Sequence, residues 1–408
     1  MEEWNIIKAY DYCYNVTDGT HDSPKQTEFG KYLITSKHIK DNRIDFESAY
    51  KISEDDYNKI ITRSKVDQWD IIISMIGAYC GFCCIESSKQ TDYAIKNVGL
   101  LKVGNELKCK WLYYYLTSPH GKQQLSKLRS GSSQPYISLG ALRNLDIPVP
   151  NENTMSDIVS VLSSLDSKIE LNRRINDNLE QQAQALFKAG FVDNPNPNWS
   201  ETTLSEVANF IGGYSYKSEE LTDSSNIAMV TIKNFGRNGE FKADGFKGII
   251  PSAKLKECHY ANLFDILVAH TDLTQNADVI GNAELLLTSD RYDSIIFSMD
   301  LVKVLPKNNF PYRFLLAAML KNKIFKGHCL GYVNGTTVLH LSKKALPEFE
   351  VRIPSKVEAK TMNDTLAPYY KRMAEVLQEN GRLMQLRNTL LPKLMSGELR
   401  ISEIEKEK

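Results

Sequence analysis

Apolar residues recur at alternating spacings of four and three along two long segments of the chain. This is the heptad pattern of a helix that packs against another helix, here over roughly four repeats. Polar residues interrupt the pattern; they lower stability but fix the register and the number of partners. The predicted seam consists of Ile158, Leu162, Leu165, Ile169, Asn172, Asn176, Leu179, Ala183 and Leu186 in the first segment and of Met362, Leu366, Tyr369, Met373, Val376, Asn380, Leu383, Arg387 and Leu390 in the second.

The two helical segments belong to a longer internal repeat. Residues 131–191 return at residues 335–395, offset by 204 positions without a gap. Before each helix, alternating and β-branched residues predict a strand, which ends at Pro150 or Pro354. An ordinary amphipathic helix on a globular domain would also fit one copy. Two copies with the same seam favour pairing of the helices with each other, and the duplication favours a split or near-symmetric ligand.

The segments before the two helices resemble each other weakly. Residues 34–39, 69–74 and 100–103 align with residues 230–235, 264–269 and 301–304 at offsets of 196, 195 and 201. Both predict short strands plus a helix, near Lys110–Lys127 and Pro311–Lys326. The framework therefore repeats while the loops diverge. The expected domains are residues 1–150, a long helix 151–190, a linker 191–198, a second domain 199–354, a second long helix 355–396 and a charged tail 397–408.

Composition narrows the class of protein. The formal net charge is +0, which argues against a simple basic DNA binder but not against charges segregated on one face. The seven cysteines fit a reducing compartment, and no signal peptide or membrane-spanning run is visible, so we expect a cytoplasmic protein. Cys80, Cys83 and Cys84 lack the second ligand pair of a zinc site, and they are better explained as small buried strand residues.

Motifs of catalysis are missing from the sequence. There is no phosphate-binding loop, no nucleophile elbow, no zinc-protease helix and no amino-methyltransferase motif, and none of the seven histidines has the spacing of a metal pair. Chance combinations of Asp, Glu and Lys are common at this charge content. We therefore expect no catalytic residues, no metal site and no cofactor in this chain.

Polar, glycine-containing loops occupy comparable places in the two halves. Their side chains and amides could reach phosphates or base edges, although any single one could be a solvated turn residue. The candidate DNA-binding residues are Thr20, His21, Lys25, Lys37, His38, Arg129, Ser132 and Gln134 in the first half and Tyr214, Lys217, Lys233, Asn234, His270, Thr271, Asn334 and Thr336 in the second.

The chain resembles the specificity subunits of type I restriction–modification enzymes over nearly its full length. The segments that carry the resemblance are "YLITSKHIKDNRIDF" from Tyr32, "SMIGAYCG" from Ser74, "ISLGALRNLDIPVP" leading into "LDSKIELNRRINDNLEQQAQALFKAGF", and "RNTLLPKLMSGEL" from Arg387. The last two segments are the specific ones. They combine heptads, a closing Leu-Phe or Leu-Leu-Pro and the duplication in one pattern.

The resemblance implies an α+β fold with two similar α/β target-recognition domains and two long antiparallel coiled-coil helices. Each domain would read one half of a split DNA target in the major groove, and the helices would set the spacer and bind two methyltransferase subunits. Restriction subunits would join through these partners, which would hold S-adenosylmethionine, ATP and Mg. One departure from the repeat is Arg387, which stands where the first copy has Ala183.

Two other functions remain compatible with the sequence. The neutral charge also permits a scaffold whose two globular domains bind proteins rather than DNA. A nuclease or transferase without recognisable motifs is the third possibility.

Overall fold

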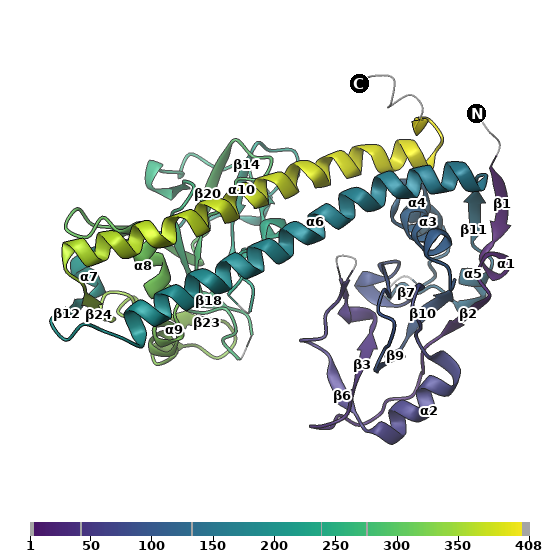
Figure 1. Cartoon of the computed structure of the whole chain (residues 1–408), viewed down its shortest axis with the longest axis horizontal. Helices are drawn as coiled ribbons and strands as arrows, with labels where there is room; N and C mark the ends of the chain where they lie inside the picture. Colours follow the sequence, from purple (N-terminus) through teal and green to yellow (C-terminus); the bar gives the residue numbers. More distant parts are fainter. Residues whose placement is uncertain (1–3, 41–42, 132–133, 238, 275, 402–408) are drawn as a thin grey trace. The chain divides into compact units, whose positions relative to one another are not determined.

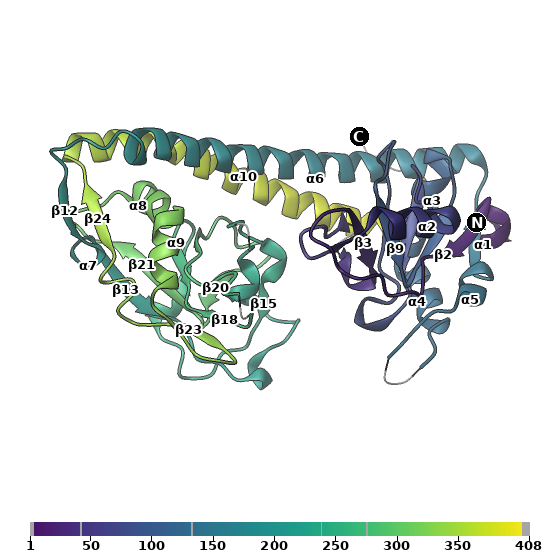
Figure 2. The same ribbon diagram turned by 90° about the horizontal axis from the view of Figure 1, so that it is seen from below.

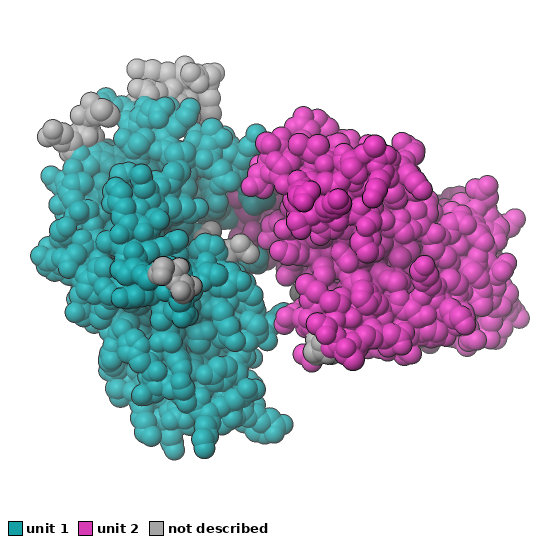
Figure 3. Space-filling view, turned by 180° about the vertical axis from the view of Figure 1, so that it is seen from behind, with its two compact units in different colours: residues 1–167, 384–408 teal, residues 168–383 magenta. Residues whose placement is uncertain are grey.

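The computed structural model describes residues 4–40, 43–131, 134–237, 239–274 and 276–401. The chain divides into two compact units (Figure 3). Unit 1 consists of residues 1–167 and 384–408, and unit 2 consists of residues 168–383. These boundaries differ from the expected domains, because each unit combines one globular part with a stretch of both long helices. Of the expected charged tail 397–408, residues 402–408 lie outside the described residues, whereas Leu399 and Ile401 pack on the core of unit 1.

The two long helices are α6 (Glu152–Phe187) and α10 (Lys356–Met395) (Figure 1). In unit 1, Arg387 of α10 donates a hydrogen bond to Asp166 of α6 at 3.0 Å. In unit 2, Asn172 of α6 donates to Asn380 of α10, also at 3.0 Å. In unit 1, Ile158 of α6 also lines a hollow with Gly397 and Leu399, which follow α10, and in unit 2 Gly190, just after α6, lies beside Met362 of α10. Within each unit, residue numbers therefore fall along α10 as they rise along α6. The antiparallel pairing implied by the family resemblance is confirmed within each unit.

Most of the predicted seam lies on the inner faces of these helices, with one clear error. Leu186 is 40% exposed, whereas Phe187, one position further, is 3% exposed. A heptad seam has a period of 3.5 residues and a straight α-helix one of 3.6, so the seam drifts by about 20° per heptad. Buried positions are Ile158, Leu162, Ile169, Asn172, Ala183, Leu366, Met373, Val376 and Asn380; half-buried ones are Leu165, Asn176, Leu179, Met362, Tyr369, Leu383, Arg387 and Leu390.

The globular part of unit 1 is built from short strands and helices (Figure 2). Sheet β2-β10-β7-β8 is antiparallel, sheet β6-β3-β9 pairs β3 parallel to β9, and β1 pairs with β11. The elements are β1 (Asn5–Lys8), α1 (Ala9–Tyr12), β2 (Asn15–Asp18), β3 (Lys31–Thr35), β4 (Ile39–Lys40), β5 (Arg43–Ile44), β6 (Tyr50–Ile52), α2 (Glu54–Ser64), β7 (Asp70–Ser74), β8 (Cys83–Ile85), β9 (Tyr93–Lys96), β10 (Val98–Lys102), α3 (Glu106–Thr117), α4 (Pro119–Lys127), α5 (Leu139–Arg143) and β11 (Asp146–Val149).

Unit 2 repeats this arrangement with additions. Sheet β13-β21-β17-β19 corresponds to β2-β10-β7-β8, β14 pairs parallel to β20 as β3 does to β9, and β12 pairs with β24. Sheet β18-β23-β22 stands where unit 1 has isolated bridges from Tyr136 to Ile76 and to Ser130, and strand β16 is added beside β20. The elements are β12 (Ser200–Thr203), α7 (Leu204–Val207), β13 (Ala208–Gly212), β14 (Ile227–Val230), β15 (Lys247–Gly248), β16 (Tyr260–Ala261), β17 (Ile266–Ala269), β18 (Thr271–Asp272), β19 (Ala283–Leu285), β20 (Ser294–Phe297), β21 (Leu301–Pro306), α8 (Arg313–Leu320), α9 (Lys323–Leu330), β22 (Val333–Asn334), β23 (Leu339–Leu341) and β24 (Glu350–Ile353).

The single helix expected in each half is in fact two helices. In unit 1, Ser118 ends α3 and caps α4, accepting the amide of Gly121 at 3.1 Å, with Pro119 as the first residue of α4. In unit 2, Asn322 caps α9 by accepting the amide of Ile324 at 2.9 Å. A short polar side chain at the cap satisfies amides that have no partner inside the new helix, so the chain can turn there.

The predicted strand and linker around each long helix also needed correction. Within the strand expected before α6, residues 139–143 form α5. The expected linker 191–198 starts with a π-helical turn (Lys188–Val192) that continues α6. Phe191 of this turn stacks on Phe187 with ring centroids 4.8 Å apart, and Asn196 donates a hydrogen bond to Glu358 at 3.0 Å. The linker is therefore folded onto unit 2.

Each long helix is held by the core of the unit it passes through. In unit 1, Trp111 of α3, Leu162 of α6 and Leu394 of α10 lie in one apolar cluster. In unit 2, Leu316 of α8 and Leu366 of α10 lie in another. Burying each such side chain contributes about 1.5–3 kcal/mol, which fixes the helices to the sheets.

Candidate nucleic-acid interface

Four strands of each unit run in the same direction, so the loops that follow them gather at one edge. In unit 1, β2 and β7 both pair antiparallel with β10, and β3 runs parallel to β9. A parallel bridge from Thr20 to Lys96 joins the two sheets at this edge. In unit 2, a parallel bridge from Tyr214 to Ser298 has the same role for β13 and β20.

A hairpin completes the edge in both units. In unit 1, Tyr136 bridges both Ser130 and Ile76, the residue that begins the loop after β7. In unit 2, His340 pairs with Asn334 and with Thr271, which follows β17. We call this edge the strand-end surface. It comprises residues 19–23, 36–38, 76–82, 96–97, 129–131 and 134–137 in unit 1 and residues 213–217, 232–234, 270–273, 298–300 and 333–341 in unit 2.

The structure brings most of the sequence-predicted residues to these surfaces. Ser132 lies outside the described residues, and Lys25 lies on the loop between β2 and β3. Exposed candidates are His21, Lys25, Lys37, Arg129, Gln134, Lys217, Lys233, Asn334 and Thr336; Thr20 and His270 are half-buried; His38, Tyr214, Asn234 and Thr271 are buried.

His38 and Asn234 are buried side chains that cap their own turns. Nδ1 of His38 accepts the amide of Thr35 at 2.9 Å, and Oδ1 of Asn234 accepts the amide of Thr231 at 2.9 Å. Both side chains are fully buried and cap a short 3-10 turn at equivalent positions. Burial lowers the pKa of His38, which keeps the ring neutral and able to accept. The repeated Thr-x-Lys-His/Asn pattern thus encodes a turn that leaves its lysine exposed.

Tyr214 and Thr271 are also held inside the fold. The hydroxyl of Tyr214 donates to Glu220 at 2.9 Å and accepts the amide of Ser252 at 3.0 Å. The hydroxyl of Thr271 donates to Asp300 at 2.9 Å. A polar residue in a loop can satisfy the loop itself, and the sequence pattern does not separate this use from ligand binding.

Cations lie on the strand-end surface although the chain is neutral. Lys37 and Lys233 project from the equivalent capped turns. Lys96 donates to Ser23 at 2.6 Å, and Arg129 donates to the carbonyl of Cys80 at 2.6 Å. Exposed ammonium and guanidinium groups beside turn amides can bind phosphate oxygens. In unit 2, burial and the neighbouring His340 and Lys343 lower the pKa of His270, whose neutral ring can both donate and accept.

A left-handed residue followed by a buried aspartate–lysine pair occurs in both units, at the end of the sheet opposite the strand-end surface. Trp69 and Phe264 have left-handed backbones, with φ of 66° and 68°. The aspartate that follows each is buried beside a lysine of the next strand: Asp70 lies 2.7 Å from Lys102, and Asp265 lies 3.8 Å from Lys303. Burial raises the pKa of Asp70, and the hydrogen bond from Lys102 opposes this. The aligned segments 69–74 and 264–269 therefore repeat because they build the scaffold.

Sequence reasoning missed three aromatic residues on the surface of unit 1. Phe82 and Tyr136 are each 46% exposed, and the ring of Tyr79 packs edge-on against Phe82 at 5.7 Å. The sequence feature that could have indicated this loop is Tyr79 between Gly77 and Gly81, a pattern typical of a tight turn.

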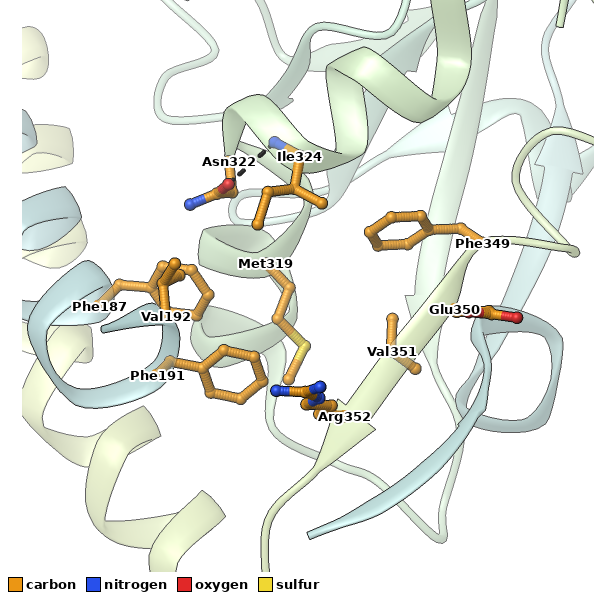
Figure 4. Close-up of a pocket in the computed structure, with 10 residues that line it drawn as sticks. All are labelled: Phe187, Phe191, Val192, Met319, Asn322, Ile324, Phe349, Glu350, Val351 and Arg352. Carbon is orange, nitrogen blue, oxygen red and sulfur yellow. Dashed lines mark hydrogen bonds between the residues drawn. The ribbon is translucent and has the colours of Figure 1, made fainter. Parts of the chain in front are cut away.

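The pocket drawn in Figure 4 lies elsewhere in unit 2, and its lining includes no residue of the strand-end surface. It has a volume of about 330 Å³ and is lined mainly by apolar side chains, among them Phe191, Met319 and Val351. The repeat offset places Met319 at the position of Tyr115, whose buried ring donates a hydrogen bond to the carbonyl of Asp146 at 2.8 Å in unit 1. The hollow is therefore explained by a smaller core side chain.

Among the described residues, no cluster of His, Cys, Asp and Glu could hold a metal ion. Cys83 and Cys84 are buried in β8, and burial raises the pKa of Cys83 to about 12, so its thiol stays protonated. No helix in the same residues combines the length and hydropathy of a bilayer span.

Comparison with known proteins places the chain. A family model described as "Type I restriction modification DNA specificity domain" matches residues 1–181 and 196–383. The MjaIX specificity subunit of Methanocaldococcus jannaschii is 23% identical over 313 residues, covering 72% of this chain and 70% of that protein. The HindI specificity subunit of Haemophilus influenzae is 22% identical over 348 residues, covering 68% and 74%.

A solved structure shows the same fold. It is the S subunit of a type I restriction–modification system from M. genitalium, with a TM-score of 0.50, 18% identity and 96% coverage of both chains. The two matched segments together span most of the 408 residues. This chain therefore belongs to the family defined by the type I restriction modification DNA specificity domain, which it contains twice.

Proposed function

We propose that this chain is the non-catalytic specificity subunit of a type I restriction–modification complex and that its two strand-end surfaces read the two halves of a split DNA target. One observation carries the proposal. The same scaffold of capped turn, buried Asp–Lys pair and edge hairpin occurs in both units, with different exposed side chains on each. A repeated frame with unlike loops suits two readers of unlike half-sites.

The exposed chemistry fits the two kinds of contact that a DNA reader makes. Lys37 and Arg129 in unit 1, and Lys217 and Lys233 in unit 2, would bind backbone phosphates. Gln134 and Asn334 carry amides that can pair with adenine edges in the major groove. Acidic residues elsewhere in the chain balance these cations, so the chain has no net positive charge. DNA binding would therefore depend on partner subunits for further phosphate contacts.

The repeated helices would supply the docking surface for partners. A face that occurs twice is matched to two copies of one protein, and the partners proposed are two methyltransferase subunits. Restriction subunits would join through them. S-adenosylmethionine, ATP and Mg would belong to these partners, and we propose no cofactor for this chain.

Exchange of one reader tests the proposal. The chain is co-expressed with its methyltransferase subunit, and methylated positions are mapped across the host genome. Residues 1–150 are then replaced by the corresponding segment of another specificity subunit. We expect one half of the methylated target to change, while the other half and the amount of methylation stay the same.

Two outcomes would contradict the proposal. An unchanged target after the exchange would mean that the domains bind proteins rather than DNA, as in a scaffold. Turnover by the purified chain alone, with metal or nucleotide added, would mean that it is an enzyme. A matched exchange of residues 199–354 serves as the control, because it should change only the other half of the target.

A further inference from the structure

The loop after β7 in unit 1 is unusually well fixed for an exposed segment. The amide of Gly77 donates to the carbonyl of Pro135 at 2.8 Å, and the amide of Gly81 donates to that of Ser74 at 2.8 Å. Both glycines have positive φ, at 80° and 94°. Arg129 holds the middle of the loop through the carbonyl of Cys80. The loop is therefore preorganised, and little conformational entropy would be lost when it binds.

This rigid loop carries an apolar surface. Phe82 is 46% exposed and packs against Tyr79, and Tyr136, also 46% exposed, is bridged to Ile76 at the start of the loop. We call Tyr79, Phe82 and Tyr136 the aromatic cluster. Aromatic rings left in water on a fixed loop lack the burial that would stabilise them.

Positive charge borders the aromatic cluster. The 3-10 turn that presents Lys37 packs against the turn of Gly77–Tyr79. Arg129 is bonded to the loop itself, through the carbonyl of Cys80. A surface that is apolar at its centre and cationic at its border matches a base edge flanked by phosphates.

Only one apolar group is available on the edges of stacked base pairs in the major groove, namely the 5-methyl group of thymine. The faces of the bases are covered by stacking, and exposing one would cost a few kcal/mol. A rigid, laterally packed pair of rings suits a methyl group better than an extruded base.

We propose that the aromatic cluster selects thymine in the first half-site by contacting its 5-methyl group. The proposal rests on the proposed function of the chain as a DNA reader. It assigns Phe82 and Tyr136 as specificity-determining residues. Unit 2 has His340 in the place of Tyr136, so its reading of the second half-site would differ in chemistry.

The test uses the complex of this chain with its methyltransferase subunit and the target found by methylation mapping. Each thymine of the first half-site is replaced in turn by uracil, which lacks only the methyl group, and binding is measured by fluorescence anisotropy. We expect at least one replacement to weaken binding by about 3- to 10-fold, as loss of one buried methyl group implies. The Phe82→Ala variant should bind thymine DNA as weakly as the wild type binds that uracil DNA and should not respond to the replacement.

Several results would overturn the inference. They are a first half-site without thymine, wild-type binding that is indifferent to every uracil replacement, or an undiminished uracil response in both Phe82→Ala and Tyr136→Ala. Increased 2-aminopurine fluorescence on binding, without a uracil effect, would instead indicate an extruded base. The control is Tyr10→Ala, an exposed aromatic residue of α1 in unit 1 that lies outside the strand-end surface, which should keep the uracil response. Failure of the proposed function would look different, because no sequence-specific binding would then occur.

Discussion

A buried cluster of charges in unit 2 makes stability depend on pH. Lys321, at the end of α8, donates to Glu284 of β19 at 2.5 Å and lies 3.4 Å from Glu180 of α6. Glu284 is 2% exposed, and its second oxygen, Oε1, has no hydrogen-bond partner among the residues that the structure describes. Two carboxylates therefore compete for one ammonium group, and the nearer one, Glu284, is shielded from water.

The magnitude follows from the pKa of Glu284. This pKa is raised from 4.5 to about 7, mainly by burial. The negative charges of Glu180 and Glu240 add to the rise, and Lys321 opposes it. Between these values the folded protein holds a proton that the unfolded chain has lost, so stability falls as pH rises from 4.5 to 7. The difference corresponds to about 3 kcal/mol, fully present below pH 4.5 and lost above pH 7.

The variant Glu284→Gln mimics the protonated carboxyl and cannot ionise. We expect it to match the wild type near pH 4 and to be more stable by up to about 3 kcal/mol at pH 8. Urea unfolding followed by circular dichroism and by the fluorescence of Trp199, the tryptophan of unit 2, measures the difference at each pH. The control is Glu375→Gln on α10, an exposed carboxylate whose replacement should leave the pH dependence unchanged.

Parallel pH profiles for the wild type and Glu284→Gln would refute this reasoning. They would mean that Glu284 stays ionised in the folded protein, stabilised by Lys321 alone. A variant less stable than the wild type at pH 8 would lead to the same conclusion.

Three further predictions concern single buried contacts. Asn380→Leu should cost about 1–3 kcal/mol in urea unfolding because Asn172 loses one of its two acceptors and keeps only Glu379, whereas the double change of Asn172 and Asn380 to Leu should be nearly neutral; equal losses would contradict this. His38→Ala should lower the free energy of unfolding by about 1 kcal/mol, and His38→Asn should lower it less. Because burial lowers the pKa of His38, the stabilisation is present above pH 6.5 and is lost as pH falls through the lowered pKa. Thermal melts at pH 5 and 7.5 test this. Lys102→Met should cost about 3–5 kcal/mol, since Asp70 would be left buried and unpaired, and a loss below 1 kcal/mol would show that water reaches the site.

The long helices were the part of the fold that could be predicted best. A heptad repeat over thirty residues has few alternative structures, and its duplication excludes chance. The details failed where packing departs from the ideal period. Leu186 turns outward, and Phe187 turns inward because it meets the core of unit 2 as well as α10.

The sequence predicted where the surface residues lie better than it predicted what each side chain does. Turn residues in the sequence show where loops follow strands, so most candidates do lie on the strand-end surfaces. Whether a polar side chain faces solvent or caps its own turn depends on hydrogen bonds that form only in the folded chain, as for His38 and Asn234. Phe82 was missed because the sequence does not show whether an aromatic side chain is exposed or buried.

The buried aspartate–lysine pair lies at the far end of the strand from the loop that carries the aromatic cluster. The five residues of β7 separate Asp70 from that loop by roughly 13 Å at about 3.3 Å per residue. Effects of substitutions at such distances usually add without coupling. Mutations that change the loop should therefore show little epistasis with the framework beneath it. New recognition sequences can then evolve by loop change alone, without compensating changes in the part that keeps the domain folded.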